Sequence, residues 1–102
     1  MAKRHDFDEL FSHYPAIISE MDEVFGSHVF ILTLAQRYQR LYVEALHAYR
    51  EGNEPFRQVH AILSDQLSKF PELVRFIEHR PSLNIFDDVQ GCAFWQRPAA
   101  TR

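Results

Sequence analysis

The clearest pattern in the sequence is the segment 27–51, SHVFILTLAQRYQRLYVEALHAYRE, which contains neither Pro nor Gly. Its apolar side chains recur at spacings of three and four residues, which places them on one face of a helix with polar side chains opposite. Ser27 is a favourable N-cap, and Gly52 is a favourable C-terminal stop. The segment therefore predicts one long amphipathic helix, roughly 36 Å in length at about 1.5 Å per residue.

The segments around this helix predict shorter helices. Pro15 separates two short helical patterns that precede it. After it, residues 54–70 have helical apolar spacing, and residues 72–80 continue that spacing until Pro81. The sequence thus predicts an all-α fold, a small bundle of four to five helices around one long central helix at residues 27–51.

Residues 82–96 lose the helical spacing but remain apolar. They predict an extended arm or small hairpin packed on the helices, with residues 84–86 and 92–95 as its limbs. We expect a single helical domain over residues 1–96 and a disordered tail over residues 97–102.

The composition indicates one small domain in a reducing compartment. A chain of 102 residues has the size of a single domain, and its one cysteine, Cys92, has no intramolecular disulfide partner. The N-terminal residues lack the apolar core of a signal peptide, and no run approaches the length of a membrane span. We therefore expect a soluble, cytoplasmic protein without a membrane partner.

The charge distribution disfavours nonspecific binding to nucleic acid. The net charge is -3, and residues 5–36 contain six acidic side chains and no Lys or Arg. Residues 54–76 nevertheless resemble two helices joined by a tight turn, as in a helix-turn-helix motif. A nucleic-acid-binding regulator is therefore an alternative hypothesis, with Arg37, Arg40 and Arg57 as candidate contacts.

Two features suggest chemistry, and each has a simpler explanation. Glu44 and His47 form the Glu-x-x-His spacing of di-metal helical bundles, but such sites need two copies and only one is present. Cys92 is a candidate nucleophile, but its sequence context offers no helix N-terminus that would lower the pKa of the thiol, so a buried structural thiol is the favoured explanation. A metal-dependent or cysteine enzyme is the third hypothesis, and we expect no cofactor.

The leading hypothesis is a non-enzymatic protein-protein interaction or accessory module. It rests on the long amphipathic helix, the 14% aromatic content and the lack of a recognisable catalytic motif. The expected partner is another protein or a second copy of the chain in a homo-oligomer. Tyr38, Tyr42 and Tyr49 on the long helix are the candidate contacts, although core packing explains them equally well.

Overall fold

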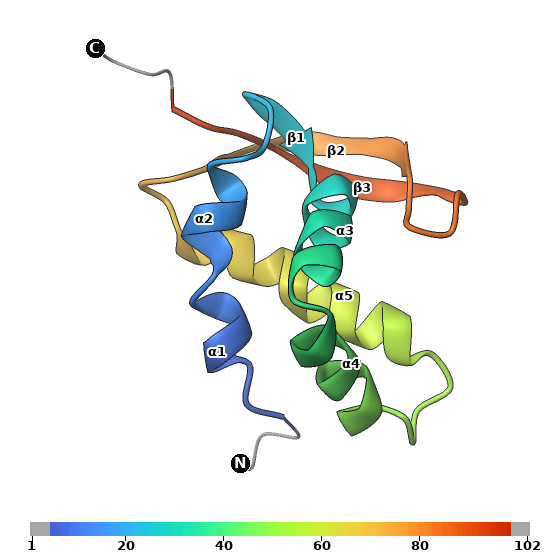
Figure 1. Cartoon of the computed structure of the whole chain (residues 1–102). Coiled ribbons are helices and arrows are strands. Elements are labelled where there is room, and N and C mark those ends of the chain that lie inside the picture. Colours follow the sequence, from blue (N-terminus) through green and yellow to red (C-terminus); the bar gives the residue numbers. More distant parts are fainter. Residues whose placement is uncertain (1–4, 99–102) are drawn as a thin grey trace.

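The computed structural model describes residues 5–98, and it combines helices with a three-stranded antiparallel sheet. The fold is therefore α+β, and the prediction of an all-α helical bundle is wrong. Figure 1 shows the sheet on one side of the helices. In chain order the elements are α1 (Asp8–Phe11), α2 (Tyr14–Ile18), β1 (Val24–Gly26), α3 (Ser27–Arg37), α4 (Gln39–Ala48), α5 (Pro55–Gln66), the 3-10 turn η1 (Leu67–Lys69), β2 (Arg75–Leu83) and β3 (Val89–Gln96).

Aromatic side chains from distant parts of the chain form the centre of the core. Tyr14 is fully buried, and its ring contacts those of Phe30 and Phe70 at centroid distances of 4.7 and 5.6 Å. The Tyr14 hydroxyl donates a hydrogen bond of 2.6 Å to the carbonyl oxygen of Leu63 in α5. This bond satisfies a polar group that would otherwise be costly to bury. Burial also raises the pKa of Tyr14, so the phenol stays neutral.

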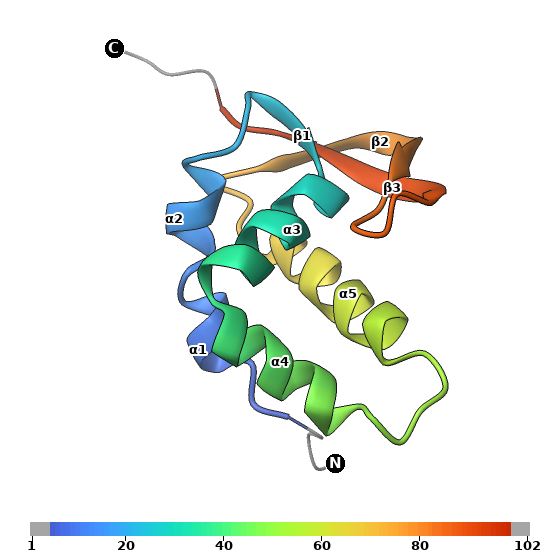
Figure 2. The same cartoon turned by 45° about the vertical axis from the view of Figure 1, so that its right-hand side comes forward.

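The predicted long helix is interrupted at Tyr38, which has φ -128° and ψ 58°. Its halves become α3 and α4, which Figure 2 shows following one another at an angle. Tyr38 stacks on His13 with a centroid distance of 3.9 Å. The break allows α3 to contact α2 and α4 to contact α1 and α5, which a straight helix spanning the domain would not do.

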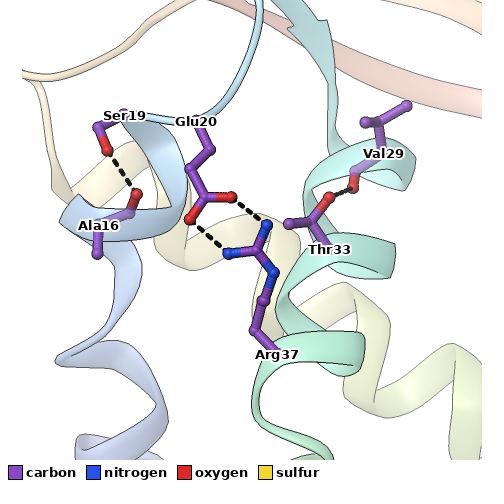
Figure 3. Close-up of polar contacts among 6 residues, drawn as sticks. All are labelled: Ala16, Ser19, Glu20, Val29, Thr33 and Arg37. Atoms are coloured by element: carbon purple, nitrogen blue, oxygen red, sulfur yellow. Dashed lines mark hydrogen bonds and ion pairs between the residues drawn. The ribbon is translucent and has the colours of Figure 1, made fainter.

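An ion pair lies beside this break. Arg37 at the end of α3 donates to Glu20 after α2 at 2.6 Å, and Figure 3 shows both of its terminal nitrogens directed at the carboxylate. Both side chains are partly exposed, so the ion pair adds little to the free energy of unfolding. Its main effect is to link the end of α3 to the segment after α2.

The helix predicted for residues 72–80 is instead strand β2, which starts at Arg75 and includes Pro81. Short apolar runs fit a helix and a strand equally well, and pairing with β3 decides between them here. Residues 84–86, expected to be a limb of the hairpin, lie in its loop. Residues 99–102 of the predicted tail lie outside the described residues.

The sheet has the order β1-β3-β2. β1 is only three residues long and pairs with Phe94, Trp95 and Gln96, whereas β2 pairs with the whole of β3. Gly26 is tightly packed in β1, since an added Cβ would lie 3.0 Å from the Phe94 ring and 3.1 Å from the Cys92 sulfur. Gly26 is the last residue of this strand and directly precedes α3.

Candidate functional site

A cleft of ≈ 540 Å³ lies between the distal half of the β2–β3 hairpin, the helix α5 and the first turn of α3. The ring of Phe86 in the hairpin loop contacts the ring of Phe56 in α5 edge to face at 4.9 Å. Clefts of this size bind small molecules or short chain segments in other proteins. We refer to this site as the hairpin cleft.

The main chain of β3 forms one wall of the hairpin cleft. Four consecutive residues, Gln90, Gly91, Cys92 and Ala93, line it. Successive side chains of a strand point to opposite faces of the sheet, so consecutive lining residues mean that the edge of the strand faces the cleft. Peptide groups are therefore part of its lining.

Ser27 connects the three elements around the cleft. Its Oγ accepts hydrogen bonds from Ser64 Oγ in α5 at 2.8 Å and from Trp95 Nε1 in β3 at 2.9 Å. The sequence predicted Ser27 as a helix N-cap, but Gly26 occupies that position, and no side chain caps α3. The hydroxyl instead accepts from the buried Trp95 indole and the half-buried Ser64 hydroxyl, and it links the hairpin to the helices.

Three of the six histidines, His28, His60 and His79, line the cleft. His60 Nε2 lies 2.6 Å from the Tyr42 hydroxyl. Burial lowers the pKa of His60 to about 4 and raises the pKa of Tyr42 to about 12, so both are neutral at pH 7. Burial also lowers the pKa of His28, whose buried Nδ1 has no hydrogen-bond partner within residues 5–98. No regular spacing in the sequence signals this convergence.

The charged groups of the cleft are mainly acidic. Asp65, Asp88 and Glu54 line it together with a single cation, Arg57. Arg57 already pairs with Glu54 at 3.5 Å. Because the imidazoles of His28 and His60 are neutral at pH 7, the cleft has a surplus of negative charge.

Cys92 is buried where α3 starts beside β3. Its sulfur accepts a hydrogen bond of 3.4 Å from the backbone N–H of His28. Burial raises the pKa of the thiol, which keeps it protonated and a poor nucleophile. Cys92 is therefore a buried thiol in the structure, which is the simpler of the two explanations that the sequence suggested.

The other candidates for chemistry lie apart from the cleft. Glu44 and His47 are exposed on α4, and Glu44 pairs with Arg40 at 3.1 Å. Within residues 5–98, no group of three or more His, Cys, Asp or Glu side chains is arranged to hold a metal ion. The same residues contain no helix long and apolar enough to cross a bilayer.

The three tyrosines proposed as contacts make contacts within the chain. Tyr38 stacks on His13, Tyr42 is buried against His60, and the Tyr49 ring lies 6.3 Å from that of Phe7. Their aromatic surface is therefore used largely inside the molecule.

The three arginines proposed as phosphate contacts are each paired with a glutamate. Arg37 pairs with Glu20, which is distant in the sequence. Arg40 pairs with Glu44 four residues later, and Arg57 pairs with Glu54 three residues earlier. They come from the end of α3, the start of α4 and the start of α5. Their charge is therefore locally compensated at each position.

Comparison with family models, with curated proteins and with solved structures finds no match for this chain.

Proposed function

We propose that the protein is a non-enzymatic interaction module of the cytoplasm that binds a protein partner through its β2–β3 hairpin. The distribution of exposed apolar side chains carries this proposal. Of the ten large hydrophobic residues that are exposed within residues 5–98, five lie on this hairpin: Phe76, Ile77, Leu83, Phe86 and Val89.

This concentration differs from the rest of the surface. Val89 and Leu83 are 68% and 56% exposed and pair with each other across the hairpin end. Grouped apolar side chains are uncommon on monomers and are typical of contact surfaces. Val43 on α4 is equally exposed, at 58%, but it is not part of such a group.

The hairpin is also held rigidly, as a recognition element should be. The Trp95 indole is buried and bound to Ser27, and the Phe76 ring contacts it edge to face at 5.7 Å. A surface that is ordered before binding loses less entropy when a partner docks. The exposed end is thus presented on a fixed base.

Nucleic-acid binding remains the rival hypothesis, but the charges do not favour it. The helix-turn-helix expected within residues 54–76 is replaced by α5, η1 and β2. Here the helix that would enter the major groove, α5, carries Arg57 paired with Glu54, and the hairpin loop carries Asp87 and Asp88. Phosphate contacts require Lys or Arg at such positions.

Site-specific photo-crosslinking in the native host cell tests the proposal. A photoreactive phenylalanine derivative replaces Val89 in one variant and Val43 in the control. We expect a discrete protein adduct from position 89, either another protein or a second copy of this chain, and none from position 43. Adding Leu83→Ser should lower the adduct yield about tenfold, since it removes a neighbouring apolar contact.

Mass spectrometry of the adduct separates the hypotheses. A nucleic-acid adduct at position 89, or equal yields at positions 89 and 43, would contradict the proposal. Light scattering over a dilution series then distinguishes self-association from binding to a different protein.

A further inference from the structure

The hairpin cleft exposes an edge of β3 that has no neighbouring strand. The backbone N–H of Arg97 donates to the Glu23 carbonyl at 2.8 Å. In an antiparallel pair every second residue directs its N–H and C=O to the same neighbour, so Gly91, six positions before Arg97, also directs them to the β1 side. β1 ends at Gly26, opposite Phe94, and the chain then turns into α3. In the described part of the chain, no strand continues along residues 89–93 on this side.

The outer edge of β2 is protected, in contrast. A bulge lies between Phe76 and Glu78. The backbone N–H of Asn84 donates to the Asp88 carbonyl at 2.8 Å, so Asn84 directs its peptide groups towards β3. Because this direction alternates along an antiparallel strand, the backbone nitrogen of Pro81, which carries no hydrogen, faces the outer edge of β2. Proline and bulges are the usual means by which proteins prevent a further strand from pairing.

The distal part of the β3 edge has neither a proline nor a bulge. Gly91 is exposed, and a Cβ added to it would meet no atom within 4 Å. Residues 89–91 are exposed, whereas Cys92 is buried beside the first turn of α3, so the free edge covers these three residues, as many as β1 pairs at the other end of β3. The edge therefore offers main-chain donors and acceptors within a cleft that is open to another segment.

The side chains of the cleft indicate what this segment carries. Asp65 and Asp88 take part in no ion pair among the described residues, and Arg57 is engaged by Glu54. Phe56 and Phe86 supply apolar rings beside these acids. A segment that alternates apolar and basic side chains would complement both features, since alternate residues of a strand face opposite sides.

We propose that the hairpin cleft binds an extended, basic segment of a partner protein, which pairs as an added strand with residues 89–91 of β3. This inference rests on the proposed interaction function and specifies the chemistry of the partner. Main-chain hydrogen bonds supply the affinity, and Asp65 and Asp88 select lysine or arginine over acidic side chains.

Binding of model peptides to the full chain tests the inference. The probe is a capped hexapeptide of alternating valine and lysine, compared with its valine-glutamate counterpart. The lysine peptide should bind about tenfold more tightly or better, and the preference should shrink with added salt. Amide hydrogen exchange should slow at Gly91 on binding, and amides of α1 should not change.

A third peptide isolates the main-chain contribution. N-methylation of every amide of the lysine peptide keeps its charge but removes its hydrogen-bond donors, and we expect at least a tenfold loss of affinity. On the protein side, Asp65→Asn together with Asp88→Asn should weaken binding about fivefold, whereas Asp22→Asn, a change at an exposed acid elsewhere, should not. Gly91→Pro removes a backbone N–H from this edge and should abolish binding, provided that Trp95 fluorescence shows an intact hairpin. If the hairpin is disturbed in this variant, the methylated peptide tests the main-chain contribution instead.

The outcomes separate this inference from the proposed function. Equal binding of the lysine and glutamate peptides, absence of binding, or binding without protection of Gly91 would overturn the strand-addition model. If the cross-link at position 89 persists in that case, the interaction function stands and only its mode is wrong. Protection of the same amides by a DNA duplex would assign the cleft to nucleic acid and overturn the inference.

Discussion

The helical half of the molecule and the β2–β3 hairpin have similar apolar content but use it in opposite ways. In the helices the largest side chains are buried, and Tyr14 and Phe30 are both 0% exposed. In the hairpin, five large hydrophobic residues remain exposed, and only Trp95 and Cys92 are buried. The difference indicates that stability comes mainly from the helices, whereas the hairpin surface is available for contacts.

The most severe test of this contrast is Phe30→Ala. Phe30 contacts the rings of Tyr14 and Phe25, so its removal leaves a cavity at the centre of the core. We expect a loss of about 3–5 kcal/mol in the free energy of unfolding, measured by urea denaturation. The control Val89→Ala should change stability by less than about 0.5 kcal/mol. Similar costs for the two variants would mean that the hairpin surface is part of the stabilising core.

Ser27→Ala tests how firmly the two regions are joined. The substitution removes the acceptor for Trp95 Nε1 and Ser64 Oγ, which leaves the buried indole N–H without this partner, whereas Ser64 is half-buried. We expect a loss of about 1–3 kcal/mol, with an altered Trp95 emission spectrum. Ser64→Ala deletes only the bond within the helical half, so its emission spectrum should stay close to that of the unchanged protein. An unaltered spectrum in Ser27→Ala would show that packing alone fixes the hairpin.

A smaller effect is expected from acidification, because His60 lies between the two regions. Burial lowers its pKa to about 4, whereas in the unfolded chain it is about 6.5. Below pH 6.5 the unfolded chain therefore binds a proton that the folded chain does not, and stability falls as the pH decreases from about 6.5 to 4. The proximity of His28 acts in the same direction.

The expected loss is roughly 1–2 kcal/mol between pH 7 and pH 4.5, measured by urea denaturation at each pH. In His60→Gln this part of the pH dependence should disappear. An equally steep decline in that variant would assign the effect to other groups.

The sequence predicted the helical half better than the hairpin, for physical reasons. In residues 27–51 the apolar spacing is long enough to indicate a helix, and α3 and α4 do occupy it. The break at Tyr38 coincides with stacking on His13, 25 positions earlier, and no local sequence signal predicts it. In residues 72–80 the apolar run is too short to separate helix from strand, and the deciding partner, β3, lies beyond Pro81.

The cleft was harder still to predict from the sequence. It is assembled from His28, His60 and the β3 edge, which are far apart in the chain. Three histidines reach the cleft from α3, α5 and β2, and only the packing of these elements brings them together. Tyr38, Tyr42 and Tyr49 were singled out as aromatic residues on a periodic helix, but periodicity does not distinguish a core face from a contact face.

The unequal edges of the sheet set a limit on assembly. A sheet with two open edges can add strands on both sides, and the product grows into fibres. Here the bulge and Pro81 protect the outer edge of β2, so strand addition is confined to the β3 side of the sheet. If strand addition at β3 is correct, the hairpin would therefore offer one pairing edge per chain, which favours a one-to-one complex over a polymer.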